Sequence, residues 1–306
     1  MDLELELQKQ GVNMALLEAV KEFRIQNQTE ENFLYRVPQP RYLYYGKEVW
    51  EAALAAILCG ENLLLAGPKA TGKNTLAENL ATIFGRPVWN ISCYVNIDAA
   101  ALIGTDTFVN QNVVFRDGPV SLCAKHGGFG VLDEINMAKN EALAVLHAVL
   151  DFRKNIDVSG YDTIALHKAT RFVATMNHGY AGTREINEAL ASRFVIIHMP
   201  PITTENLQKL LLREFPNLKP QWAEQFAMLF HELEQKCNSS EISTKALDFR
   251  GLLAAIRMIQ KGLTAEMALR MGIVNKSFDA LERKLIEDMI AVRIPKTFGA
   301  SDLFDR

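Results

Sequence analysis

A short glycine-containing segment with one lysine has the composition of a phosphate-binding turn. It runs from Gly67 to Lys73 as GPKATGK, which fits the pattern GxxxxGK. Glycines let the backbone turn tightly so that its N–H groups point at phosphate oxygens, and the lysine adds a positive charge. In the usual pattern the next residue carries a hydroxyl group that holds magnesium. Here that residue is Asn74, whose amide oxygen is also an acceptable magnesium ligand.

Nucleotide contacts are therefore expected along one continuous run of the chain. Thr75 also has a hydroxyl group, but it stands one step further round the expected helix, so Asn74 is the preferred metal ligand. Because Asn74 departs from the usual pattern, the rate of hydrolysis stays open. The expected contact residues are Gly67, Pro68, Lys69, Ala70, Thr71, Gly72, Lys73, Asn74 and Thr75.

An acidic pair follows the lysine by about sixty residues. Asp133 and Glu134 come directly after an apolar run. We expect Asp133 to hold magnesium, directly or through water, and Glu134 to act as the general base that polarises an attacking water. Acidic residues are also common at helix N-termini, and the phosphate loop upstream is what favours the catalytic interpretation. Asn177 ends the next apolar run and would orient the same water or the γ-phosphate.

Three arginines and one lysine are candidates for completing such a site. Arg193 lies between a short expected helix and a strand, where an exposed guanidinium could reach the γ-phosphate of a neighbouring subunit. Arg184 is the alternative for this role. Arg250 begins an apolar helix further along, where it could contact the nucleotide of its own subunit, and Lys245 is the alternative there.

Strands and helices alternate in the part of the chain that carries these residues. Such alternation of apolar strands with helices predicts an α/β fold: a parallel five-stranded sheet with helices on both faces. The expected strands are 62–66, 87–91, 128–132, 171–176 and 194–199. The expected helices are 47–59, 74–84 and 140–153. Beyond the prolines at 200 and 201 the pattern indicates helices only, and this predicts a C-terminal all-helical lid.

The chain is expected to divide into three regions, which are an N-terminal extension at 1–41, an α/β domain at 42–200 and a helical domain at 201–306. In the extension, apolar residues between 16 and 24 predict one amphipathic helix. Two inserts interrupt the α/β domain, and each is expected to contain a hairpin. They lie near 104–120, with a turn at 110–112, and near 154–170.

Composition narrows the classes of function. The 306 residues are 49% hydrophobic and carry a net charge of −3, which gives no long-range attraction toward nucleic acid or acidic membranes. The four cysteines form no CxxC pair and the six histidines show no metal-ligand spacing. The acidic N-terminus is unlike a signal peptide, and the longest apolar run, 52–59, is too short to span a bilayer. We therefore expect a cytoplasmic protein.

Taken in order, these motifs resemble the MoxR branch of the AAA+ ATPases, and among its members the CbbQ/NorQ-like proteins. The resemblance covers about 42–270, and its motifs beyond the phosphate loop are 46–49, 115–119, 131–135, 173–180 and 187–194. It implies a P-loop NTPase fold, ATP and Mg²⁺ as cofactors, and a homo-oligomeric ring, usually a hexamer, with ATP between subunits. It also implies partner-facing inserts, and it matches Asn90 to the residue that restrains the catalytic glutamate in many relatives.

Two functional hypotheses follow. The resemblance implies a chaperone that uses ATP to remodel or activate a client protein complex, often together with a von Willebrand factor A-domain partner. The alternative is an ATP-gated assembly scaffold that hydrolyses little because of Asn74. A nucleic-acid motor is disfavoured by the charge balance, and a small-molecule kinase by the lack of an acceptor site.

Overall fold

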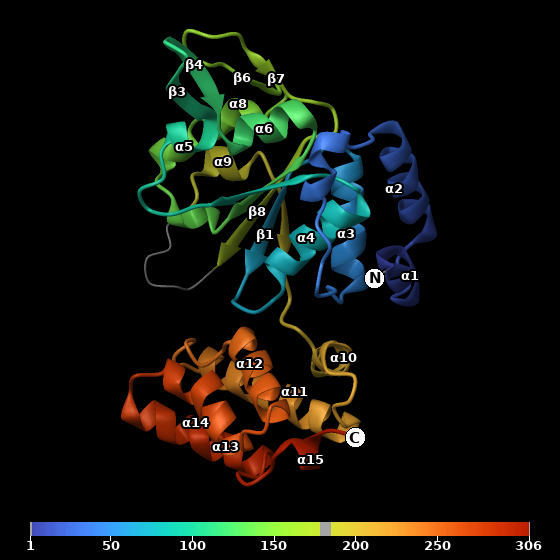
Figure 1. The fold of residues 1–306 in the computed structure, drawn as a ribbon, viewed down its shortest axis with the longest axis vertical. Helices are drawn as coiled ribbons and strands as arrows, with labels where there is room; N and C mark the ends of the chain where they lie inside the picture. Colours follow the sequence, from blue (N-terminus) through green and yellow to red (C-terminus); the bar gives the residue numbers. More distant parts are fainter. Residues whose placement is uncertain (1, 178–184, 306) are drawn as a thin grey trace. The chain divides into compact units, whose positions relative to one another are not determined.

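The computed structural model describes residues 2–177 and 185–305. The chain divides into two compact units, 1–200 and 201–306, of which the first is α/β and the second helical (Figure 1).

A parallel five-stranded sheet forms the centre of the first unit, as the sequence predicts. Its strand order is β2-β5-β8-β1-β9, and every neighbouring pair is parallel. The observed limits lie within one or two residues of the expected ones, because each strand is an apolar run bounded by polar or turn residues. The strands are β1 (Leu63–Gly67), β2 (Val88–Ser92), β5 (Phe129–Asp133), β8 (Arg171–Asn177) and β9 (Val195–His198).

Helices pack on both faces of the sheet, because successive strand residues point to opposite sides. Leu63 and Leu65 of β1 join one core, and Leu64 joins the other. The first core includes residues of α1 (Leu3–Lys9), α2 (Met14–Gln26), α3 (Lys47–Leu58) and α4 (Lys73–Ile83). The second core includes residues of α5 (Ala99–Ile103), α6 (Pro119–His126), α7 (Asn140–Leu143), α8 (Leu146–Leu150) and α9 (Glu188–Ala191).

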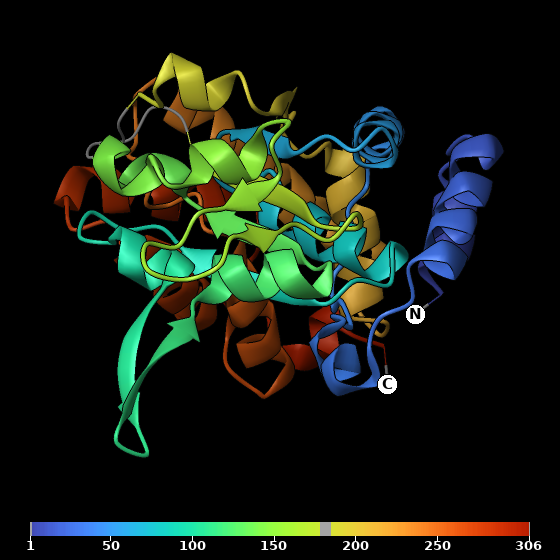
Figure 2. The same ribbon diagram turned by 90° about the horizontal axis from the view of Figure 1, so that it is seen from above.

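Both predicted hairpins are present. The longer hairpin pairs β3 (Gly104–Val109) with β4 (Asn112–Asp117), and the shorter pairs β6 (Asn155–Ile156) with β7 (Ile164–Ala165). Figure 2 shows the longer hairpin projecting from the rest of the α/β unit. The hydroxyl group of Tyr161 donates to Oδ1 of Asp106 at 2.7 Å, so the two inserts lie side by side.

The N-terminal region contains a helix that the sequence pattern did not reveal. Leucine and glutamate alternate in its first residues, which is a period of two and not of a helix. The structure nevertheless forms α1, in which Leu3 and Leu7 are buried four residues apart while Leu5 is 48% exposed. Asp2 begins the helix by accepting a hydrogen bond from the N–H of Leu5.

The predicted helix at 140–153 is shorter and interrupted. It splits into α7 and α8, and the N–H of His147 donates to the carbonyl oxygen of Ala144, an i to i+3 bond that tightens the turn. Helix α8 ends at Leu150 and Asp151 is extended, so that residues 151–154 form a loop.

A buried arginine ties the N-terminal region to the sheet. The Arg86 side chain is almost completely enclosed and donates to three carbonyl oxygens, those of Asn27, His126 and Gly127. Beside it, the hydroxyl group of Thr29 donates to the carbonyl oxygen of Gly85 at 2.7 Å. The region before residue 42 is therefore packed into the first unit.

The second unit consists of helices, with one short bridge between Leu218 and Phe304. Helices α12 (Phe249–Gln260) and α13 (Ala265–Gly272) approach closely at Gly251, where a side chain would collide with the carbonyl oxygen of Gly272. Within the described residues, no helix has the length and apolar character needed to cross a membrane. The helices are α10 (Thr204–Glu214), α11 (Pro220–Asn238), α12 (Phe249–Gln260), α13 (Ala265–Gly272), α14 (Ala280–Arg293) and α15 (Ala300–Leu303).

Candidate functional site

The glycine-containing segment forms a turn between a strand and a helix, as expected. Gly67 ends β1 and Lys73 begins α4. Between them, Ala70 and Gly72 have left-handed backbones, with φ of 62° and 82°. A side chain on Gly72 would lie 3.1 Å from the Tyr44 ring, so this position combines an unusual backbone with a close contact.

Lys73 points back into this turn. Its ammonium group donates to the carbonyl oxygens of Pro68 and Gly67, at 2.6 and 3.0 Å, and contacts the Thr71 hydroxyl at 3.3 Å. Burial lowers its pKa to about 8, although nearby Asp133 and Glu134 act in the opposite direction. All three acceptors are neutral, so a buried positive charge faces the turn without an acidic group bonded to it in the described part of the chain. The turn therefore fits an anionic ligand such as a phosphate.

The remaining expected contacts lie around the same turn. Asn74 is exposed and Thr75 half-buried on the first turn of α4, where a helix carries partial positive charge. Pro68 is exposed, and Lys69 is half-buried. The structure thus brings the whole predicted segment together at the N-terminus of one helix.

The strand order brings the acidic pair and Asn177 to the same edge as the turn. Strand β8 lies between β1 and β5, and Gly67 is in register with Asn177. Asp133 is the last residue of β5, and Asn177 is the last residue of β8. Because the strands are parallel, their carboxyl ends meet, which is where open α/β sheets bind ligands.

Thr175 connects the acidic pair, and the sequence interpretation gave it no role. Its hydroxyl group donates to Oδ1 of Asp133 at 2.6 Å and accepts from the N–H of Glu134 at 3.0 Å. A signal was present in the sequence, because Thr175 stands two residues before Asn177 on a strand. Their side chains therefore point to the same face.

Glu134 is held by Asn177 in this structure. Glu134 has a left-handed backbone with φ of 54°, and its Oε1 accepts from Nδ2 of Asn177 at 3.0 Å. The backbone oxygen of Asn177 in turn accepts from Nδ2 of Asn136 at 2.9 Å. Asn90, expected at the end of its strand, lies in the middle of β2, and within the described residues it makes no hydrogen bond to Glu134.

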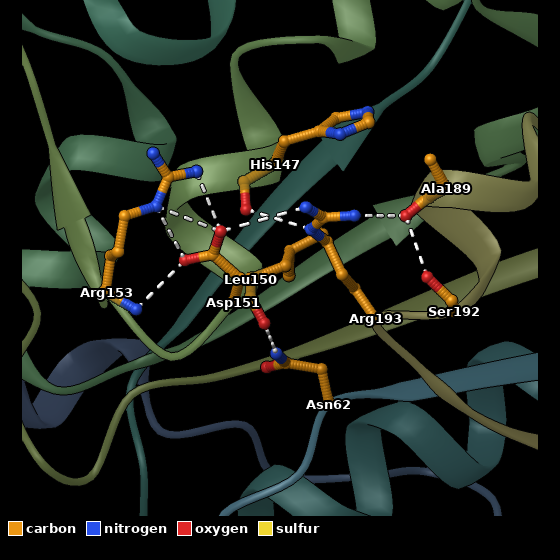
Figure 3. Close-up of polar contacts among 8 residues, drawn as sticks. All are labelled: Asn62, His147, Leu150, Asp151, Arg153, Ala189, Ser192 and Arg193. Carbon is orange, nitrogen blue, oxygen red and sulfur yellow. Dashed lines mark hydrogen bonds and ion pairs between the residues drawn. The ribbon is translucent and has the colours of Figure 1, made fainter.

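Arg193 is partly buried and held in place within its own chain (Figure 3). Its Nε donates to the carbonyl oxygen of His147 at 3.1 Å, and its Nη1 donates to that of Ala189. Its Nη2 lies 3.7 Å from Oδ2 of Asp151. Only 23% of the side chain is exposed, so the guanidinium is less exposed than the sequence led us to expect.

The other predicted candidates lie elsewhere. Arg184 and the segment 178–180 are outside the described residues. Arg250 is exposed at the second position of α12, and the ammonium group of Lys245 lies 5.5 Å from the centre of the Phe278 ring. Both lid candidates therefore belong to the second unit, and their contact with a nucleotide stays a prediction.

Comparisons with known proteins match the part of the chain that carries the turn and the acidic pair. Residues 62–194 match the family model described as AAA domain (dynein-related subfamily). The chain is 35% identical over 243 residues to the uncharacterized protein YojN of Bacillus subtilis (strain 168), which covers 78% of this chain and 79% of that protein. An uncharacterized protein of Staphylococcus aureus (strain bovine RF122 / ET3-1) is 33% identical over 249 residues, covering 79% of this chain and 94% of that protein. Among solved structures, a mutant of Thermotoga maritima RuvB shares the fold, with a TM-score of 0.50 and 18% identity over 80% of this chain and 76% of that chain.

Proposed function

Because the chain belongs to the AAA+ family of ATPases, we propose that it binds ATP with Mg²⁺ and hydrolyses ATP to remodel or activate a partner protein complex. The observation that carries this proposal is the meeting of three groups at one edge of the sheet. These are the buried Lys73 ammonium group, the Asp133 carboxylate held by Thr175, and the Glu134 carboxylate bonded to Asn177.

Each of these groups has a distinct part in the proposed reaction. Lys73 and the N–H groups of the turn bind the phosphates. Asp133 and Asn74 supply oxygen ligands of the kind that Mg²⁺ prefers, and the bound metal ion would neutralise charge on the phosphate oxygens. Glu134 accepts the proton of the attacking water, and Asn177 keeps the carboxylate in position.

Assembly completes the proposed site. We propose that the chain belongs to the MoxR branch and forms a homo-oligomeric ring, a hexamer, in which Arg193 reaches the γ-phosphate bound by the next subunit. Arg250 or Lys245 would contact the nucleotide of its own subunit. An arginine supplied by a neighbour makes hydrolysis depend on assembly, and such arginines contribute about 10³–10⁵ in rate.

The inserts support a protein client. On the longer hairpin, Phe108 and Val113 are paired across the strands and are 71% and 61% exposed. A cavity of about 560 Å³ lies beside its base, lined in part by Phe115 and Tyr161. Exposed apolar surface of this kind suits a protein contact. We propose a client protein complex, with a von Willebrand factor A-domain protein as partner, and neither nucleic acid nor a membrane.

The experiment that tests the proposal compares the wild type with Glu134→Gln. The wild type is expected to release phosphate from ATP, and Glu134→Gln is expected to bind ATP without turning it over. A wild type that binds ATP and releases no phosphate would overturn the remodelling-chaperone hypothesis and leave the scaffold hypothesis.

Asn74 separates the two hypotheses more directly. If its amide oxygen serves the metal, Asn74→Ala lowers the Mg²⁺-dependent turnover, whereas Asn74→Thr retains or raises it. A scaffold would assemble equally well with ATP and with a non-hydrolysable analogue, and its assembly would be the same in the wild type and in Asn74→Thr. The readouts are phosphate release and oligomer size measured on the same samples.

A further inference from the structure

Asp151 lies between two arginines but binds them very unequally (Figure 3). Arg153 contacts both of its oxygens, with Nη2 at 2.7 Å from Oδ2 and Nε at 3.2 and 3.0 Å from Oδ1 and Oδ2. The backbone N–H of Arg153 adds a fourth bond, to Oδ1 at 2.9 Å. Arg193 stays farther from the carboxylate, with its Nη2 at 3.7 Å from Oδ2.

These distances show that the Asp151 carboxylate forms its hydrogen bonds with Arg153 and not with Arg193. A charge-assisted hydrogen bond between an arginine and a carboxylate spans about 2.7–2.9 Å, and a separation of 3.7 Å is too long for one. The bonds from Arg153 are the main reason that the pKa of Asp151 lies below its ordinary value. The carboxylate is therefore ionised at neutral pH and is bonded to Arg153.

The backbone bonds of Arg193 orient its guanidinium group without neutralising it. The acceptors of Nε and Nη1 are the carbonyl oxygens of His147 in α8 and Ala189 in α9. Neutral acceptors fix the plane of the group but add no negative charge beside it, so its ion pair is the long contact with Asp151 at 3.7 Å. The Nη2 end is the part of the group closest to Asp151, and it is the end that a closer carboxylate would neutralise.

We propose that Arg153 is a positioning residue for Arg193: it holds the Asp151 carboxylate away from the Nη2 end of Arg193, so that this end keeps its charge for a phosphate on the neighbouring subunit. This inference rests on the proposed function of Arg193 in trans. Without Arg153, the carboxylate needs to move by only about 1 Å to form a direct bond with Arg193, and the attraction between opposite charges favours that movement.

The test is a pair of variants in the full-length protein. Arg153→Gln is expected to lower the kcat of ATP hydrolysis about tenfold or more while KM for ATP changes little, because one close carboxylate offsets the charge that stabilises the transition state. Adding Asp151→Asn to it removes that carboxylate and is expected to restore kcat to within about threefold of the wild type. Arg283→Gln, at an exposed position of α14, is the matched control.

A subunit-mixing measurement locates the defect. Arg153→Gln subunits retain a complete phosphate-binding turn. Lys73→Ala subunits lack the lysine of that turn but carry an intact Arg193. Mixed assemblies are expected to recover part of the turnover, because an Arg153→Gln subunit next to a Lys73→Ala subunit then receives an Arg193 whose own Arg153 is intact. Failure to recover, with both variants folded and assembled, contradicts positioning in trans.

Three outcomes keep this inference separate from the proposed function. If Arg193→Ala retains full turnover, Arg193 has no role in trans and the proposed assembly of the site is wrong. If Arg193→Ala is inactive but Arg153→Gln is unaffected, only the inference about Arg153 is wrong. If the double variant is as impaired as Arg153→Gln alone, Arg153 does not act through Asp151, and the inference is again overturned.

Discussion

The side-chain amide of Asn177 donates a hydrogen bond to the Glu134 carboxylate at 3.0 Å, and this bond joins the ends of two neighbouring strands. Glu134 stands just past the last residue of β5, with a left-handed backbone, and Asn177 is the last residue of β8. The orientation of the proposed general base is thus set by a residue 43 positions away in the sequence.

Loss of the hydrogen bond between Asn177 and Glu134 is expected to slow ATP turnover. Asn177→Ala removes the donor to a carboxylate, an interaction of about 1.5–3 kcal/mol, so kcat is expected to fall roughly 10- to 100-fold while ATP binding persists. Asn90→Ala is the comparison variant, because Asn90 does not bond to Glu134 in the described structure. Steady-state kinetics of ATP hydrolysis distinguish the two residues. An equal or larger fall in kcat for Asn90→Ala would show that Asn90 is the residue that restrains Glu134.

Thr175 is expected to control magnesium dependence. Thr175→Val keeps the shape of the side chain but removes the hydroxyl group that bonds Asp133 and the N–H of Glu134. We expect a higher Mg²⁺ concentration for half-maximal turnover, together with a loss of about 1–3 kcal/mol in the free energy of unfolding. Thr175→Ser restores the hydroxyl group, and it should resemble the wild type in magnesium titrations. An unchanged Mg²⁺ requirement in Thr175→Val would exclude a role for this hydroxyl.

Nucleotide affinity is expected to fall at alkaline pH. The pKa of Lys73 is lowered to about 8 in the free protein because of burial. Below that pH the ammonium group is already charged, whereas well above it binding must take up a proton. The dissociation constant for ATP should therefore rise by up to about tenfold per pH unit above 8, measured with Glu134→Gln to prevent turnover. Lys73→Arg in the same background keeps its charge, and its pH profile should be flat. A profile as steep in that variant would show that another group titrates.

Arg86 is expected to stabilise the first unit strongly. Arg86→Met leaves the carbonyl oxygens of Asn27, His126 and Gly127 without their buried donor. At about 1–3 kcal/mol for each unsatisfied buried group, with partial access of water, the free energy of unfolding should fall by roughly 3 kcal/mol. Urea unfolding followed by tryptophan fluorescence measures this, since Trp50 and Trp89 both lie in the first unit. Arg283→Met serves as the surface control, and equal stability of the two variants would refute the prediction.

Much of the fold could be predicted because its signals are local. Each strand of the sheet is an apolar run, and the prolines at 200 and 201 mark the junction between the units. Helix α1 was missed because its leucines alternate with glutamates, and only packing decides that Leu3 and Leu7 are buried. The helix expected over 140–153 ended early at Leu150. In the loop that follows, the Asp151 carboxylate accepts from the backbone N–H of Arg153, a local bond that the helical pattern did not show.

The sequence by itself determined the chemical groups of the site: the glycines and lysine of the turn, the acidic pair, and the polar residue at the end of the next strand. Those features depend on residue types and on short spacings along the chain, so they can be recognised without the fold. Only the tertiary structure decided which groups touch. The order of parallel strands placed Thr175 on Asp133 and Asn177 on Glu134. The loop at 151–154 placed the Asp151 carboxylate on Arg153 and 3.7 Å from Arg193. Such pairings depend on distances between residues far apart in sequence, and these distances are fixed only when the strands and helices pack together.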